Sequence, residues 1–195
     1  MANFSVVTVK RWVRYKRQEW KVAHLPIDGA HPWLDVGCGS FPLPDADFVG
    51  DLTPQSFDLP EMQDKLRGRF VRLDLHYLPF GDRTFGFVHC SNVLEHMEEP
   101  GRAIAELKRV SRHGFVETPR AFFDNVLIHS KGHRWIVSWK GSEILIDQPK
   151  QRWIGVFQIL PLPFSPWIRN KHRLLWKILV NILDFMGLAF QHYKW

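Results

Sequence analysis

Residues 33–52 read WLDVGCGSFPLPDADFVGDL, and they predict how the sheet of this protein begins. The apolar run ends in a glycine turn at Gly37 and Gly39, which is typical of the carboxyl end of a buried parallel strand. A dinucleotide fingerprint has a third glycine after this turn, where a helix packs closely on the strand, but Pro42 occupies that position. No GKS or GKT is present, so NAD, FAD and P-loop nucleotides are disfavoured.

Further apolar runs alternate with a segment of helical spacing. Residues 93–110 are predicted to be helical because Ala103, Ile104, Leu107 and Val110 fall on one face. Such alternation produces parallel βαβ units, so we expect an α/β fold with a doubly wound, mostly parallel, Rossmann-like sheet. The other predicted strands are FVGDL (48–52), RFVRLDL (69–75), FGFVHCSN (85–92) and GFVETP (114–119).

Two features modify this sheet. Alternating runs on either side of Lys140 and Gly141 predict an antiparallel hairpin at one edge. Eleven residues separate Gly39 from Asp51, which is too few for an ordinary crossover helix with its loops. We therefore expect a shortened first crossover with at most one turn of helix.

We expect one domain over residues 1–195, with ends that differ from its middle. Residues 1–24 carry six cations and one acid, and residues 168–195 carry five cations and one acid. These basic ends suit RNA, an anionic membrane surface or an acidic substrate, and solvated helix faces account for them equally well. The expected parts are a basic N-terminal helix in 1–28, a cofactor-binding core in 33–150, and a C-terminal extension with an apolar helix in 151–195.

The composition favours a globular protein of a reducing compartment. The two cysteines, Cys38 and Cys90, are too few for a disulfide framework, and no secretory leader is recognisable. Polar interruptions at Lys177, Asn181 and Asp184 argue against a bilayer span in the apolar terminal helix. We expect a cytoplasmic protein, with attachment to the membrane periphery as an alternative.

Three carboxylates lie at the carboxyl ends of successive predicted strands, at the same edge of the sheet. Asp35 precedes the glycine turn, and Asp51 and Asp74 end the next two strands. The carboxyl ends of parallel strands form the crevice where such sheets bind ligands. Acids in this position suit a cationic nucleoside, because they accept hydrogen bonds from ribose hydroxyls and an exocyclic amine.

The motifs DVGCGS (35–40), GDL (50–52) and LDLHYLPFGDRTFGFVHCSNVLEHMEEPGRAIAELKRV (73–110) occur in this order. They resemble successive motifs of the S-adenosylmethionine-dependent methyltransferases with a Rossmann-like fold, in the type 11 group related to small-molecule and ubiquinone-pathway methyltransferases. The resemblance extends from about residue 33 to residue 119. One departure is the short first crossover, which opens one wall of the cofactor site. Another is VSRHGFVE (110–117), where the family has a proline and paired glycines.

The resemblance implies S-adenosylmethionine as cofactor and S-adenosylhomocysteine as product. It also implies a role for each matching position. Asp35 would set up the turn near the positive end of the ligand. The other implied contacts are Gly37 and Gly39 at the methionine end, Asp51 at the ribose, Asp74 and Leu75 beside the adenine, and Ser91 or Asn92 beside the sulfonium. For Asn92, a helix N-cap is an equally good interpretation.

Methyl transfer requires alignment of the acceptor and sometimes a proton acceptor, so catalytic residues are not fixed by a motif. No NPPY, DPPY or Pro-Cys motif is present, which disfavours methylation of DNA bases and release factors. Catalytic candidates are His133, Glu117 and His96, with Glu95 and His96 also explained as structural residues of the family's helix motif. His129 and His133 have HxxxH spacing without a convincing third ligand, so no metal site is expected.

We therefore expect a methyltransferase acting on a small-molecule or lipid-like acceptor. An RNA methyltransferase that uses the basic ends is one alternative. A non-catalytic interaction module with the same fold is another. The apolar C-terminal helix is expected to pack on the body or on a second copy, giving a possible homodimer, and RNA or an anionic membrane surface is a less favoured partner.

Overall fold

The computed structural model describes eight parts of the chain, which belong to two compact units. Unit 1 comprises Met1–Ser91, Arg102–Val116 and Lys194–Trp195, and unit 2 comprises Asn92–Gly101 and Glu117–Tyr193. The described residues are 20, 23, 31–39, 42–43, 45–52, 68–121, 132–149 and 190–195.

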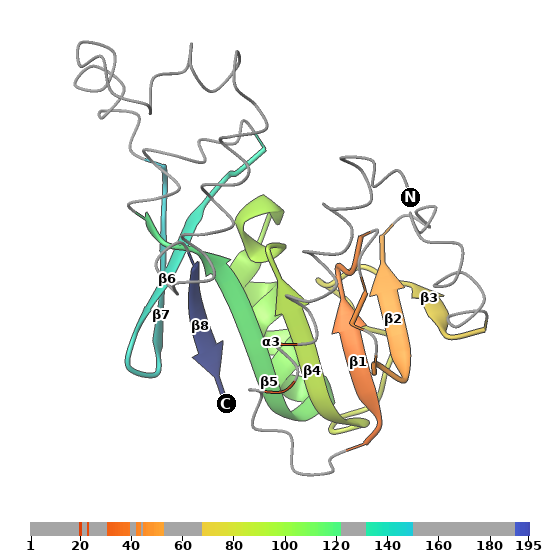
Figure 1. The fold of residues 1–195 in the computed structure, drawn as a ribbon. Coiled ribbons are helices and arrows are strands. Elements are labelled where there is room, and N and C mark those ends of the chain that lie inside the picture. The colour runs from red at the N-terminus through yellow and green to blue at the C-terminus, as the bar shows by residue number, and fades with distance from the viewer. Residues whose placement is uncertain are drawn as a thin grey trace, which may run out of the picture. The chain divides into compact units, whose positions relative to one another are not determined.

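The main sheet confirms the predicted parallel strands (Figure 1). Its order is β3-β2-β1-β4-β5-β8, and β1 pairs in parallel with both β2 and β4, as β2 does with β3. Consecutive strands therefore extend outward from β1 in both directions, as in a doubly wound sheet. The strands are β1 (Trp33–Val36), β2 (Phe48–Asp51), β3 (Phe70–Arg72), β4 (Phe85–Ser91), β5 (Ser111–Pro119) and β8 (Phe190–Lys194).

Burial explains why the central strands have near-continuous apolar sequences. All four residues of β1 are buried, and so are the first six of β4. A strand that is covered on both faces has no solvent-facing side chains, so its sequence does not alternate between apolar and polar residues. Trp33 and Phe87 pack edge to face at 5.9 Å and share one core cluster with Phe115.

The helix α3 (Pro100–Val110) is shorter than the segment predicted to be helical. Residues Leu94–His96 form a separate 3-10 turn, η1, and α3 begins only at Pro100, whose fixed φ and missing N–H suit a first helical position. The predicted apolar face is confirmed, because Ala103, Ile104, Leu107 and Val110 are all buried. In Figure 1 the helix lies along one face of β4 and β5.

The predicted hairpin forms, but its predicted place at the edge of the main sheet is wrong. Strands β6 (Ile136–Lys140) and β7 (Glu143–Asp147) pair antiparallel around Gly141, which has a φ of 63°, and they make a separate two-stranded sheet. The edge beside β5 is occupied by β8 instead. Gly114 and Trp195 exchange both backbone hydrogen bonds, at 3.2 and 3.3 Å, which is the pattern of an antiparallel pair.

The helices predicted for the two ends of the chain lie almost wholly outside the described residues. The segments concerned are residues 1–28 and 151–189, and the homodimer expected through the C-terminal helix falls there too. Within the described residues, no helix is long and apolar enough to cross a membrane.

Candidate functional site

The glycine turn after β1 is held against the end of β2. Gly37 and Gly39 have φ values of 64° and 51°, a left-handed conformation that glycine adopts without the strain a side chain brings. The Gly37 N–H donates to the Gly50 carbonyl at 2.7 Å, and the Gly39 N–H donates to Asp51 Oδ2 at 2.9 Å. The structure thus brings together three of the predicted cofactor residues, with the Asp51 carboxylate beside the turn.

Asp35 lies in the interior rather than on the surface of this crevice. Its Oδ2 accepts a hydrogen bond from the Leu43 N–H at 2.7 Å, and its Oδ1 lies 2.7 Å from Nδ1 of His89. Asp35 and His89 are both almost completely buried, and the His89 ring stacks on Phe115 at 5.6 Å. Asp35 therefore fixes the crossing segment and β4 relative to β1, and its partner His89 was not anticipated from the sequence.

The crossing between β1 and β2 packs without a helix in its described residues. Between Gly39 and Phe48 none of the residues that the structure describes is helical, as expected for a shortened crossover. Leu43 and Ala46 are buried and form a cluster with Val49, against which Cys38 packs. Burial raises the pKa of the Cys38 thiol, and the charges of Asp35 and Asp51 raise it further. The thiol is therefore held neutral, which makes it a poor nucleophile.

Asp74 and Leu75 follow β3 in a tight turn. Asp74 Oδ1 accepts from the His76 N–H at 2.9 Å and lies 2.7 Å from His76 Nδ1. The backbone hydrogen bond from His76 lowers the pKa of Asp74, so this exposed carboxylate stays ionised. Leu75, the next residue, is buried. The Tyr77 N–H closes the turn on the Asp74 carbonyl at 3.0 Å.

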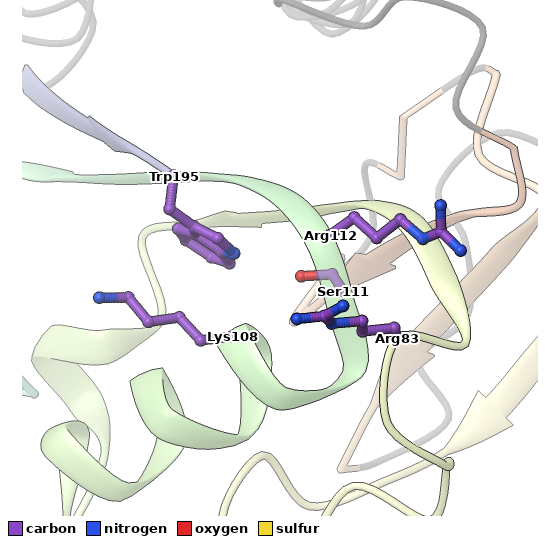
Figure 2. A pocket seen from close by; sticks show the side chains of 5 residues that line it. All are labelled: Arg83, Lys108, Ser111, Arg112 and Trp195. Atoms are coloured by element: carbon purple, nitrogen blue, oxygen red, sulfur yellow. The ribbon is translucent and has the colours of Figure 1, made fainter.

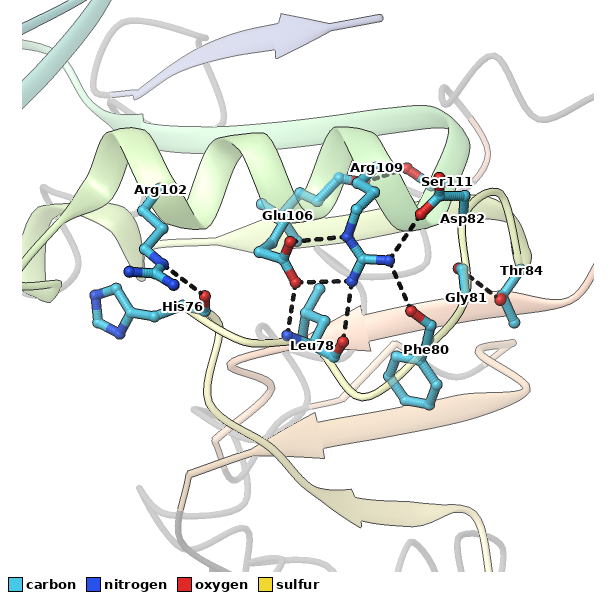
Figure 3. Close-up of polar contacts among 11 residues, drawn as sticks. His76, Leu78, Phe80, Gly81, Asp82, Thr84, Arg102, Glu106, Arg109 and Ser111 are labelled. Carbon is cyan, nitrogen blue, oxygen red and sulfur yellow. Dashed lines mark hydrogen bonds and ion pairs between the residues drawn. The ribbon is translucent and has the colours of Figure 1, made fainter.

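The loop after Asp74 is anchored on α3 by one arginine (Figure 3). Arg109 makes a bidentate contact with Glu106, with Nε to Oε1 and Nη2 to Oε2 both at 2.8 Å. The same guanidinium donates to the carbonyls of Leu78 and Phe80 and to Asp82, and Glu106 accepts from the Leu78 N–H. These bonds hold the backbone that follows the predicted adenine-binding turn.

Ser91 and Asn92 end β4 with a change of backbone direction. Ser91 is half-buried, and Asn92 has a φ of 55°, a left-handed conformation that asparagine tolerates better than most residues. The Asn92 N–H donates to the Glu117 carbonyl at 2.9 Å. Val93 occupies the cap position before η1, so the N-cap interpretation of Asn92 is not what the structure shows.

The three catalytic candidates fall in unit 2, at two different places. Glu117 is fully buried on β5, and its Oε2 lies 3.4 Å from Nδ1 of His192 on β8. His192 was not anticipated from the sequence. His96 and His133 lie together, with ring centroids 4.7 Å apart and planes at 78°. His129 is outside the described residues.

A separate pocket lies at the amino-terminal end of β5, in unit 1 (Figure 2). Three cations and the Trp195 indole surround a volume of about 460 Å³. None of the predicted cofactor residues lines it, so it is distinct from the glycine turn. Its lining residues are Arg83, Lys108, Ser111, Arg112 and Trp195.

Residues 34–115 match the family model of the methyltransferase domain. This match covers less than half of the chain, so it is a similarity of residues 34–115 to methyltransferase domains. Among curated proteins, the chain is similar to an uncharacterized methyltransferase of Schizosaccharomyces pombe. The two are 33% identical over 100 residues, a match that covers 42% of this chain and 36% of that protein. The match thus spans little more than a third of that relative's length.

Solved structures of similar proteins include two methyltransferases dependent on S-adenosylmethionine. One, from Thermotoga maritima, is described as a possible histamine N-methyltransferase; it is 19% identical, with 66% of this chain and 70% of that chain covered and a TM-score of 0.48. The other, from Archaeoglobus fulgidus, is 16% identical, with 63% and 61% covered and a TM-score of 0.46. The family match over residues 34–115 includes the glycine turn, Asp51, Asp74 and α3.

Proposed function

We propose that the protein is a methyltransferase that uses S-adenosylmethionine and releases S-adenosylhomocysteine. The similarity of residues 34–115 to methyltransferase domains supports this cofactor, and one observation on the structure supports it most. The glycine turn and the carboxylate at the end of β2 are joined by the 2.9 Å hydrogen bond from Gly39 to Asp51. That bond orients the carboxylate at the carboxyl edge of a parallel sheet, where such folds bind nucleosides.

The residues present fit the chemistry of the cofactor. Among the residues that the structure describes, chain neighbours aside, none has an atom within 4 Å of the position that a Cβ of Gly39 would occupy, so these residues leave that side of the turn open. Asp51 is half-buried and suited to accept from ribose hydroxyls, and the exposed Asp74 carboxylate is suited to accept from the adenine amine. Gly37 and Gly39 would line the methionine end, Leu75 the adenine, and Ser91 or Asn92 the sulfonium.

Asp35 would act through the turn, since both of its oxygens are already engaged in the interior. The cofactor, when bound, supplies a methyl group on a positively charged sulfur. The protein's part is to align the acceptor, to exclude water and, where the acceptor carries a proton, to remove it. His133, Glu117 and His96 remain the candidates for that proton transfer.

Titration calorimetry with S-adenosylmethionine and S-adenosylhomocysteine tests cofactor binding. Asp51→Asn keeps the shape of the side chain but removes its charge, and a hydrogen bond to a charged group contributes about 1.5–3 kcal/mol. We expect both ligands to bind the variant about 10- to 100-fold more weakly. Asp45→Asn is the matched control, because Asp45 is exposed and lies in the same crossing. Failure of the folded wild-type protein to bind either ligand would refute the proposal.

The acceptor is proposed to be a small or lipid-like molecule. Incubation of the protein and a cell extract with cofactor carrying a deuterated methyl group, followed by mass spectrometry of separated fractions, tests this class. Label in organic-soluble or small polar molecules supports it. Label in RNA instead establishes the alternative that the basic ends suggest. Cofactor binding without any transfer favours the non-catalytic module.

A further inference from the structure

Unit 2 contains a cluster of three side chains with the composition of a metal site. Glu95, His96 and His133 each present one potential ligand atom, and these atoms all lie within 4.8 Å of one another. Two imidazoles and one carboxylate form a donor set that recurs in sites for transition metals. The sequence alone does not indicate this set of ligands, because His133 lies 37 positions beyond His96 along the chain.

The two segments that carry the cluster are fastened to each other by backbone hydrogen bonds. The N–H groups of Arg134 and Trp135 both donate to the Glu95 carbonyl, at 2.7 and 3.2 Å. The Trp135 indole N–H donates to the Met97 carbonyl at 3.0 Å. The side chains of residues 95, 96 and 133 are therefore presented from a fixed backbone, which reduces the ordering that an ion must impose.

The hydrogen bond of His96 prepares one of its nitrogens for coordination. Nδ1 lies 2.9 Å from the Gly132 carbonyl oxygen. A carbonyl only accepts, so Nδ1 carries the proton and Nε2 of the neutral ring carries the lone pair. Metal-binding histidines commonly donate their second nitrogen to a backbone carbonyl in this way, which fixes both the tautomer and the ring orientation.

The cluster is buried on its carboxylate side and reached by solvent on its histidine side, as in an open metal site. Glu95 is only 1% exposed, and a buried carboxylate is stabilised by a cation beside it. His96 is exposed and His133 is half-buried, so solvent reaches the cluster from the histidine side. Three protein ligands with a solvent-facing side leave coordination positions for water or an oxygen of another molecule, in contrast to a closed structural site.

We propose that Glu95, His96 and His133 bind one divalent transition-metal ion, with Zn²⁺ preferred over Mg²⁺ because two of the three donors are imidazoles. Ligands around one Zn²⁺ lie about 3–3.5 Å apart, from bond lengths of about 2.0–2.2 Å. Side-chain rotation must therefore draw the three donors somewhat closer when the ion binds. The site does not depend on the proposed methyl transfer, because ion binding is measured without the cofactor.

Tag-free protein stripped with a chelator and titrated with Zn²⁺, Co²⁺ and Mg²⁺ in a calorimeter tests this site. We expect one Zn²⁺ per chain and a visible Co²⁺ absorption band that reports nitrogen ligation, with no comparable Mg²⁺ binding. His133→Ala and Glu95→Gln should each weaken Zn²⁺ binding by about 100-fold or more, since even outer partners of metal ligands contribute about 10- to 100-fold. His113→Ala removes an exposed histidine of β5 and serves as the control.

His133→Ala is the decisive variant if Glu95→Gln fails to fold, because His133 is not fully buried. Cooperative thermal unfolding of each variant shows that it is folded before the titration. The proposal is overturned by wild-type protein that binds no Zn²⁺. It is equally overturned by Zn²⁺ binding that His133→Ala leaves unchanged, or by Mg²⁺ binding tighter than Zn²⁺.

Discussion

Replacement of Asp35 tests whether the acid before the glycine turn is a structural residue. Asp35 and His89 are 3% and 2% exposed, so their 2.7 Å contact is shielded from water. The Leu43 N–H that donates to the other oxygen is buried as well. Loss of the carboxylate leaves two interior donors without their acceptor, and neither can turn to solvent.

We expect Asp35→Ala and Asp35→Asn to lower the free energy of unfolding by different amounts. Asp35→Ala removes both acceptors, and each buried donor left unsatisfied costs about 1–3 kcal/mol, for a total of about 2–6 kcal/mol. Asp35→Asn keeps one acceptor oxygen and turns an amide N–H₂ toward the other donor, so we expect a loss of about 1–3 kcal/mol. For a chain of this size, Tm falls by about 2–4 °C for each kcal/mol of lost stability. Asp35→Asn should therefore lower Tm by about 2–12 °C, and Asp35→Ala should lower it by about 4–24 °C.

Urea unfolding followed by circular dichroism measures these losses, with Asp45→Asn as the exposed control that stays within about 0.5 kcal/mol of wild type. A double-mutant cycle with His89→Phe isolates the pair, because phenylalanine preserves the stacking on Phe115 but cannot donate. We expect a coupling energy of about 0.5–3 kcal/mol. An Asp35→Ala loss below about 1 kcal/mol, or strictly additive losses in the cycle, would show that the contact does not stabilise the fold.

Two further predictions concern α3 and the hairpin. The hydrogen bond from Arg109 lowers the pKa of Glu106 below its ordinary value of 4.5, so the stabilisation is complete above about pH 4.5 and is lost as pH falls through the folded-state pKa. Tm should therefore fall with acid more steeply in wild type than in Glu106→Gln, and parallel curves would contradict this. Gly141 has a φ of 63°, and no described residue beyond its chain neighbours lies within 4 Å of its Cβ position, so Gly141→Ala should cost about 1–2 kcal/mol and Gly141→Asn less, measured by urea unfolding; equal losses would exclude backbone strain as the cause.

The parallel strands were predictable because burial on both faces produces a short apolar run that is visible in the local sequence. β1 and β4 are short, mostly apolar and bounded by turn residues, so their sequences alone predict where each begins and ends within a residue or two. The helix start was not predictable in the same way. Helical spacing extends back to residue 93, but Pro100 and the 3-10 turn before it limit α3 to the last eleven residues of that segment.

The edge of the sheet depends on pairing between distant residues, which the sequence does not display. β8 reads FQHYK and pairs with β5, whose residues lie some seventy positions earlier in the chain. Its alternation of aromatic and polar residues covers only five positions, directly after an apolar run with helical spacing. The hairpin of β6 and β7 has a stronger local signal, so it was assigned to the edge that β8 occupies.

In the candidate site, too, contacts between residues that are distant in the sequence could not be predicted. Asp35, Asp51 and Asp74 were predicted together because each lies near the carboxyl end of a predicted parallel strand, but this position does not reveal which other groups bind the carboxylate oxygens. His89 lies 54 residues from Asp35 and engages it in the interior, whereas Asp51 meets the neighbouring glycine turn and Asp74 meets His76 two residues away. Three acids with one sequence pattern thus have three different surroundings. Asp35→Asn should lower stability far more than Asp51→Asn does, and Asp51→Asn should weaken cofactor binding at nearly constant Tm; if both variants lower Tm equally, the division between a structural acid and a ligand-binding acid is wrong.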